Sequence, residues 1–148
     1  MSRDRDSEEL HFVDSNVFFY AKIMDKEYGP SCAQVLRKIH ERKIMAATSV
    51  LVTLEVANAL RKFGLAKEVK NTVDSIFSLS IVVLKMDSSD IRNAIDIFHR
   101  QRISPYDCAH VAVMKHAEIS SIISADRDFD HVPGIKRKDP KHVVLRTP

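Results

Sequence analysis

Short apolar runs alternate with longer amphipathic segments along almost the whole chain, and this alternation limits the fold more than any other feature. The runs expected to form strands, rich in branched and aromatic residues, span 10–13, 44–48, 80–84, 121–124 and 142–145. The segments expected to form helices span 15–24, 29–42, 49–63, 66–79, 87–101 and 105–117. Strands that alternate with helices and are apolar on both faces predict an α/β fold, with a central parallel five-stranded sheet and helices on both faces.

Residues that start or stop helices support several of these boundaries. Gly64 follows the helix expected at 49–63, and glycine is common just after a helix ends. Asp87 begins a typical capping sequence, and Ser104 followed by Pro105 predicts another helix start, with proline in the first turn.

Length and composition indicate one domain, since 148 residues bury a core of ordinary size. We expect this domain at 10–148, after a charged, flexible tail at 1–9 that lacks the apolar stretch of a secretion signal. The longest apolar region, 44–60, is interrupted by polar residues, so we expect no membrane span.

Cys32 and Cys108 have no metal-ligand spacing and favour a reducing, cytoplasmic setting. Cys108 is interpreted as a small core residue rather than a nucleophile.

Four acidic residues stand at or just past junctions between apolar segments and turns or helices: Asp14, Glu55, Asp107 and Asp126. Parallel α/β sheets bind ligands outside the carboxyl ends of their strands, and Asp14 and Asp126 fall on that edge. Carboxylates a few ångströms apart repel one another, so their convergence would require a divalent cation among them. The joint placement therefore predicts a metal-dependent enzyme that acts on phosphates.

Asp14 and Glu55 each have a purely structural alternative. Asp14 is equally suited to cap the helix that begins near Asn16. Glu55 belongs with Asn58 to a narrow polar stripe, which is either exposed to solvent or buried. Because the helix at 49–63 is so apolar, we expect it to be buried on most sides, and a carboxylate there needs a partner or a metal.

Asp107 and Asp126 have structural alternatives as well. Asp107 lies three residues after Ser104, the spacing of a capping box, and capping alone would account for it. Asp126 is followed by Asp128 and Asp130, so this segment is also interpretable as a solvated acidic turn. No single acid decides the question.

The basic residues allow a nucleic-acid partner without requiring one. The formal net charge is +3, and lysines and arginines cluster at several places, including 136–138. Taken alone, such clusters are better explained as a solvated surface.

The chain resembles the PIN-domain ribonucleases, and most closely the VapC-type toxins. The resemblance extends from His11 to Arg146. It rests on Val-Asp-Ser-Asn at 13–16, Leu-Glu-Val-Ala-Asn-Ala-Leu at 54–60, Tyr-Asp-Cys-Ala-His at 106–110 and Ile-Ser-Ala-Asp-Arg-Asp-Phe at 123–129. Ser15 and Ser124 stand where threonine is commoner in the family, and both keep a hydroxyl.

The resemblance implies a metal-dependent endoribonuclease that cuts RNA phosphodiester bonds with Mg²⁺ or Mn²⁺ and leaves a 5′-phosphate. It implies an acidic metal pocket made by Asp14, Glu55, Asp107 and Asp126, with Asp128 as an outer acid. Asn16 and Ser124 would orient ligands or water. Candidate contacts to the RNA backbone are Arg100, Arg102, Arg127, Lys136, Arg137 and Lys138.

The resemblance also implies partners, namely a second copy in a homodimer and a small antitoxin that holds the toxin inactive. A free-standing RNA-processing nuclease and a PIN fold that grips RNA or protein without cutting are the open alternatives. A receiver domain is excluded because no aspartate ends the third expected strand. A haloacid-type phosphatase is excluded because Asp14-Ser15-Asn16 is not Asp-x-Asp.

Overall fold

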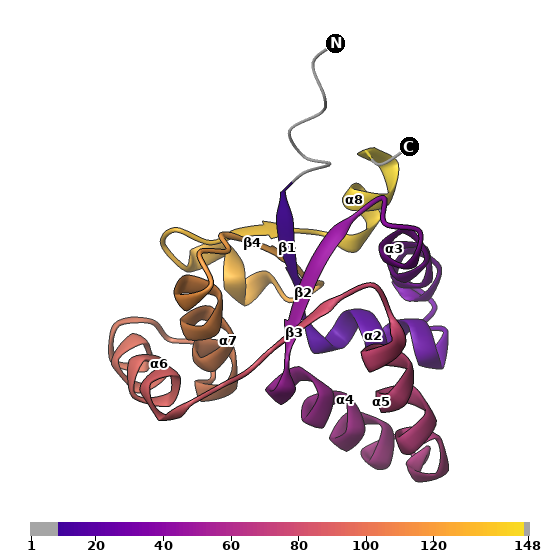
Figure 1. Cartoon of the computed structure of the whole chain (residues 1–148), viewed down its shortest axis with the longest axis horizontal. Helices are drawn as coiled ribbons and strands as arrows, with labels where there is room; N and C mark the ends of the chain where they lie inside the picture. The colour runs from indigo at the N-terminus through magenta and orange to yellow at the C-terminus, as the bar shows by residue number, and fades with distance from the viewer. Residues whose placement is uncertain (1–8, 147–148) are drawn as a thin grey trace.

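A computed structural model of the protein describes residues 9–146 (Figure 1). Its elements, in chain order, are β1 (Leu10–Val13), α2 (Ser15–Ile23), α3 (Gly29–His40), β2 (Met45–Ser49), α4 (Val50–Lys62), the 3₁₀ helix η1 (Ala66–Glu68), α5 (Val69–Ser78), β3 (Val82–Leu84), α6 (Ser88–Arg100), α7 (Pro105–His116), β4 (Ser121–Ile123), the 3₁₀ helix η2 (Arg127–His131), β5 (Lys136–Lys138) and α8 (Pro140–Arg146). Apart from Glu9, the predicted tail lies outside the described residues, so the tail and the domain boundary stay predictions. None of the helices in the described stretch combines the length and apolar character of a membrane span.

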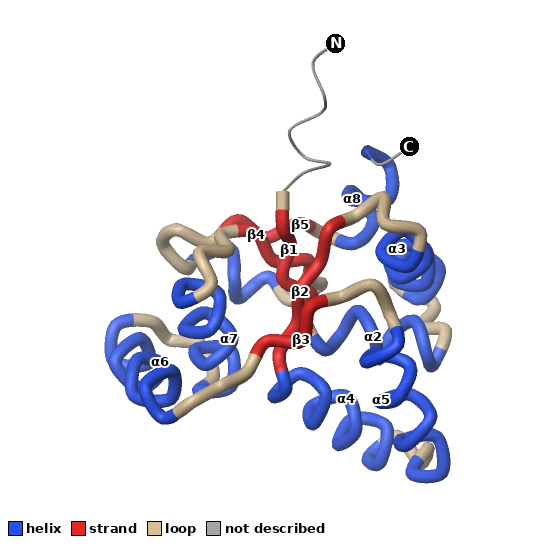
Figure 2. The backbone as a smooth tube through the Cα atoms, in the orientation of Figure 1, coloured by secondary structure: helices blue, strands red, loops and turns tan. Residues whose placement is uncertain are grey.

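The five strands form one parallel sheet in the order β3-β2-β1-β4-β5 (Figure 2). Phe12 on the central strand β1 pairs with Ala47 on β2 and with Ile122 on β4. The chain builds the sheet outward from β1 in one direction and then returns to add β4 and β5 on the other side. The ends of β1 and β4 therefore meet at a switch point, where sheets of this kind bind ligands.

Helices cover both faces of the sheet. Figures 1 and 2 show α6 and α7 together on one side and α2, α3, α4 and α5 on the other. The predicted parallel α/β fold is confirmed.

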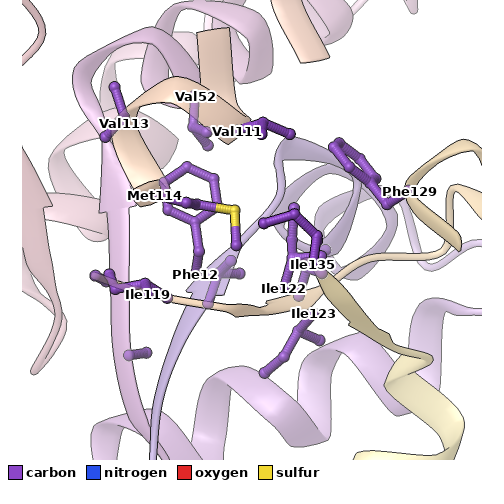
Figure 3. Close-up of a cluster of buried hydrophobic side chains, with 14 of the residues drawn as sticks. Phe12, Val52, Val111, Val113, Met114, Ile119, Ile122, Ile123, Phe129 and Ile135 are labelled. Carbon is purple, nitrogen blue, oxygen red and sulfur yellow. The ribbon is translucent and has the colours of Figure 1, made fainter. Parts of the chain in front are cut away.

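The core lies between the sheet and these helices. Phe12, Ile122, Met114, Val111 and Ile135 are buried and gather in one cluster (Figure 3). All residues at 108–114 of α7 are buried, including Cys108, as expected for a small core residue. Because the middle of α7 is enclosed on all sides, a polar side chain there has fixed surroundings.

The prediction of a fifth strand at 142–145 is wrong. The fifth strand is β5, and the Val-Val-Leu run belongs to helix α8 instead. Asp139 explains the difference, because its carboxylate accepts a hydrogen bond from the Lys141 backbone N–H at 2.9 Å and Pro140 occupies the first helical position. Lys38 holds α8 against α3 by donating from Nζ to the Val144 carbonyl at 3.3 Å.

Two further predicted elements differ from the structure. Strand β3 is an edge strand of only three residues, and Val82 on it is 55% exposed, although the run was expected to be apolar and covered on both faces. The single helix expected at 66–79 is divided into η1 and α5.

The helix boundaries around Gly64, Asp87 and Ser104 are confirmed, and Asp87 forms a complete capping box with Asp90.

Candidate metal centre

Asp14 lies directly after β1, at the switch point of the sheet. Its backbone N–H donates to the Ile123 carbonyl at 3.1 Å, which ties it to β4. Its Oδ1 accepts a hydrogen bond from the Ser15 backbone N–H at 2.8 Å, so it also caps α2. The side chain is buried, and burial raises the pKa of its carboxyl, although the His110 charge and hydrogen bonds from Ser124 and Ser15 offset part of the rise.

Ser124 and Asn16 connect Asp14 to the segment that follows β4. Ser124 Oγ donates to Asp14 Oδ2 at 2.6 Å and accepts from the Asp126 backbone N–H at 3.0 Å. The amide nitrogen of Asn16 lies 3.1 Å from Asp14 Oδ2 and 3.0 Å from Ser124 Oγ. The amide oxygen of Asn16 accepts from the Ala125 N–H at 3.2 Å. Both side chains, expected to orient ligands, thus contact Asp14 directly.

Glu55 reaches the same place from α4. This helix is less buried than expected: its buried residues form one stripe, Val52, Thr53, Val56 and Leu60, and Leu54 is 68% exposed. The Glu55 side chain is 25% exposed, and its Oε1 lies 2.5 Å from Nε2 of His110 on α7, which is its hydrogen-bond partner. The same His110 nitrogen lies 3.9 Å from Asp14 Oδ1.

Ligand atoms of Asp14, Glu55 and His110 all lie within 4.8 Å of one another and form the first of two groups able to hold a metal. Burial lowers the pKa of His110, but its hydrogen bond to Glu55 and the charges of Glu55, Asp14 and Asp107 together act more strongly. Its pKa therefore lies above the ordinary value.

Asp107, Asp126 and Asp128 form the second group, whose ligand atoms also lie within 4.8 Å of one another. Asp126 Oδ1 accepts from the Asp128 backbone N–H at 2.9 Å, so Asp126 caps η2. Ser104 Oγ accepts from the Asp107 backbone N–H at 3.1 Å. Within residues 9–146 only this half of the expected capping box forms, so helix capping does not account for the Asp107 carboxylate.

The two groups share one electrostatic environment. Burial raises the pKa of Asp107 to about 7, and the Asp14 charge adds to the rise. The His110 charge opposes it, and the charges of Asp126 and Glu55 raise the pKa by smaller amounts. A carboxyl with a pKa near neutrality marks a half-buried site that also lies beside other negative charges. The oxygen-rich donor set fits a hard divalent cation such as Mg²⁺ or Mn²⁺, which would neutralise that charge.

A groove gives access to Glu55 from solvent. It has a volume of about 640 Å³ and is lined by Ser15, Leu51, Leu54, Glu55, Asn58, Ala59, Lys62 and Tyr106. Tyr106 is 61% exposed beside Asp107.

The basic residues predicted to contact RNA differ in their surroundings. Arg100, Arg102, Arg127 and Lys136 are exposed. Lys138 is half-buried, with Nζ 3.8 Å from Glu9. The Arg137 side chain is only 12% exposed, because it binds Asp130 at 2.8 Å and donates to the Ser124 carbonyl at 3.0 Å. Arg137 thus supports the segment that carries Asp126.

His110 is the site residue that sequence reasoning missed. The signal was present, since His110 follows Asp107 by three residues and i, i+3 neighbours share one face of a helix. A histidine in a strongly apolar helix has no visible partner in the sequence, and its partner here comes from another helix.

The chain is similar to known proteins over most of its length. The family described as PIN domain matches residues 11–135. The VapC ribonuclease Mb1869c of Mycobacterium bovis and ribonuclease VapC13 of Mycobacterium tuberculosis are each 29% identical over 126 residues, which cover 84% of this chain and 96% of the relative.

Solved structures share the fold at lower identity. VapC20 of Mycobacterium tuberculosis, described as a sarcin-ricin loop cleaving toxin, matches with a TM-score of 0.70 and 16% identity, covering 82% of this chain and 93% of its own. DNA-bound VapBC of Salmonella typhimurium matches with a TM-score of 0.67 and 16% identity, covering 89% and 98%. VapBC2 of Rickettsia felis, bound to promoter DNA, matches with a TM-score of 0.66 and 13% identity, covering 87% and 97%.

Proposed function

The chain belongs to the PIN-domain family, and on that premise we propose that it is a metal-dependent endoribonuclease and the toxin of a toxin–antitoxin pair. The observation that carries this proposal is that two groups of acids, Asp14 with Glu55 and Asp107 with Asp126, are neighbours, since the charges of Asp14, Glu55 and Asp126 all act on the Asp107 carboxyl. The names of the relatives, VapC ribonucleases, support the same activity.

Each acid has a distinct part in the proposed centre. Asp14 is the most rigid ligand, because Ser124, Asn16 and Ser15 all donate hydrogen bonds to its carboxylate. Glu55 comes from α4 and lines the groove, whereas Asp107 comes from α7 and Asp126 directly precedes η2. Asp128 is exposed and completes the group with Asp107 and Asp126 as an outer acid.

Bound Mg²⁺ or Mn²⁺ would supply an activated water and stabilise charge on the phosphate oxygens. The protein's own residues align the carboxylates and bring RNA to them. The exposed basic residues Arg100, Arg102, Arg127 and Lys136, with Lys138, are the proposed contacts to RNA phosphates. Arg137 is not among the proposed RNA contacts, because it forms ion pairs with Asp130 and Asp139 within the protein.

Two protein partners are part of the proposal. Structures described as VapBC, matched over most of this chain, support an antitoxin partner. A homodimer is supported by an apolar stripe on α6, where Ile91, Ile95 and Phe98 recur at helical spacing and are each more than 40% exposed. We place the protein in the cytoplasm, in keeping with its two free cysteines.

The proposal is tested by incubating labelled structured RNAs with purified protein in Mg²⁺ or Mn²⁺, beside EDTA and the Asp14→Asn variant. We expect cleavage only when both the metal and Asp14 are present. Folded, metal-loaded protein that cuts none of a broad RNA panel would contradict the nuclease and favour a binding module.

A further inference from the structure

His110 lies between two carboxylates, at the point where a cation would also lie. Its Nε2 is 2.5 Å from Glu55 Oε1 and 3.9 Å from Asp14 Oδ1, and the side chain is completely buried. Two roles fit this position. His110 is either a nitrogen ligand to the metal or a donor that holds Glu55 in place.

The second ring nitrogen distinguishes these roles. Nδ1 of His110 is buried and meets no hydrogen-bond partner among residues 9–146. The nearby Phe12 ring, 5.6 Å away between centroids, offers only the weak acceptor of an aromatic face. A neutral imidazole that binds a metal through Nε2 carries its proton on Nδ1, and that N–H normally donates to a carboxylate, carbonyl or water. Here it would be a buried donor without a strong acceptor, which is unfavourable.

The opposite tautomer pairs Nε2 with Glu55, although Nδ1 still meets no partner among residues 9–146. With the proton on Nε2, the short contact to Glu55 is a hydrogen bond to a carboxylate, and Nδ1 is left as an unprotonated acceptor. A proton on Nδ1 alone would instead set two lone pairs against each other across 2.5 Å.

We propose that His110 is a positioning residue, which donates from Nε2 to Glu55 and does not coordinate the metal. The inference rests on the proposed function only in taking Glu55 as a ligand. Glu55 projects from the partly exposed helix α4, whereas His110 belongs to the enclosed helix α7. The hydrogen bond thus fixes a partly exposed carboxylate to the buried part of the centre and leaves an all-oxygen ligand set.

The first test needs no metal. Correlated proton–nitrogen spectra of the histidine rings, recorded on metal-free protein at a pH above the raised pKa of His110 so that the ring is neutral, report which ring nitrogen carries the proton, and His110→Gln identifies the His110 signals. We expect a proton on Nε2. A ring protonated on Nδ1 alone would overturn the proposal.

The second test compares His110→Gln with His110→Met. Glutamine places an N–H donor as many bonds from the backbone as Nε2, whereas methionine has similar length and no donor. Titration calorimetry with Mn²⁺ should show most of the affinity kept by His110→Gln. His110→Met should lose about 10- to 100-fold, the usual effect of removing a group that orients a ligand. Equal losses in both variants, with folding verified by circular dichroism, would contradict the donor role.

Electron spin-echo spectra of the Mn²⁺-loaded protein add a direct readout. We expect no imidazole nitrogen coupling to the ion, and such a coupling, lost in His110→Gln, would show that His110 is a ligand. Failure of the proposed function can be told apart from failure of this inference. Mn²⁺ binding that is unchanged in Asp14→Asn would count against the proposed function, whereas the role of His110 is still decided by the ring spectra of the metal-free protein.

Discussion

The Ser124 hydroxyl donates a 2.6 Å hydrogen bond to Asp14 Oδ2, although 110 residues separate the two in the chain. Ser124 Oγ also accepts hydrogen bonds from the Asp126 backbone N–H and from the Asn16 side-chain amide, so this one hydroxyl aligns three parts of the candidate centre. Because Ser124 follows β4 and Asp14 follows β1, this contact exists only where the two strands meet at the switch point.

Ser124→Ala should weaken both metal binding and folding. The buried Asp14 carboxylate and the Asp126 N–H each lose a partner, which costs about 1–3 kcal/mol in the free energy of unfolding. Mn²⁺ affinity should fall about 10- to 100-fold. Chemical denaturation and calorimetry measure the two effects, with Ser124→Thr as a control that keeps the hydroxyl. Wild-type Mn²⁺ affinity in Ser124→Ala would show that this hydroxyl does not align the ligands.

Asp107→Asn should stabilise the metal-free protein while it removes activity. The substitution removes a charge from a half-buried carboxyl surrounded by Asp14, Asp126 and Glu55. After allowance for solvent screening, we expect a gain of about 1–3 kcal/mol in the free energy of unfolding at pH 8. RNA cleavage should fall by more than about 100-fold, which exceeds the usual effect of removing a group that only orients a metal ligand. A metal-free variant less stable than the wild type would contradict the excess of negative charge.

The metal-free protein should lose stability as the pH rises from 3.8 to about 7. The pKa of Asp107 rises from 3.8 to about 7 on folding, so the folded state binds this proton more tightly in that window. The raised pKa values of Asp14 and His110 act in the same direction. Thermal unfolding at pH 5 and pH 8 measures the effect.

Saturating Mg²⁺ should reverse this trend, because the ion binds the ionised carboxylates and stabilises the folded state more at pH 8 than at pH 5. Asp107→Asn is the control, and its metal-free stability should depend less on pH. Metal-free stability that increased between pH 5 and pH 8 would be evidence against coupled burial of these acids.

The basic residues should separate into two classes. Arg137→Gln breaks ion pairs to Asp130 and Asp139 and the hydrogen bond to the Ser124 carbonyl, so it should destabilise the fold by about 1–3 kcal/mol. The double variant Arg100→Gln with Arg102→Gln alters exposed side chains. It should leave stability within about 0.5 kcal/mol and weaken RNA binding with a smaller salt dependence. Unchanged RNA affinity at low salt in the double variant would exclude these two contacts.

Ile95→Glu should prevent self-association. Ile95 is 45% exposed at the middle of the apolar stripe on α6, where a charge would be buried against a second copy. Sedimentation should show a dimer for the wild type and a monomer for the variant, with Arg92→Glu on the same helix as a charged control outside the stripe. A variant that remains dimeric would place the interface elsewhere.

Much of the fold follows from local patterns in the sequence. The strand before Asp14, the caps at Asp87 and Ser104 and the stop at Gly64 were predictable, because hydrogen bonds to neighbours in the chain decide them. The run at 142–145 was misassigned because Val-Val-Leu suits a strand or a helix equally. The hydrogen bond from the Lys141 N–H to Asp139 and the proline at the first helical position, Pro140, favour the helix.

The sequence by itself determined the parallel α/β class and the positions of Asp14, Glu55, Asp107 and Asp126 along the chain. Only the tertiary structure decided that His110 binds Glu55, that Arg137 forms an ion pair with Asp130, and that β3 lies at an edge of the sheet. The reason is physical: capping and periodicity involve residues a few positions apart, whereas burial and long-range hydrogen bonds depend on the order in which the strands assemble.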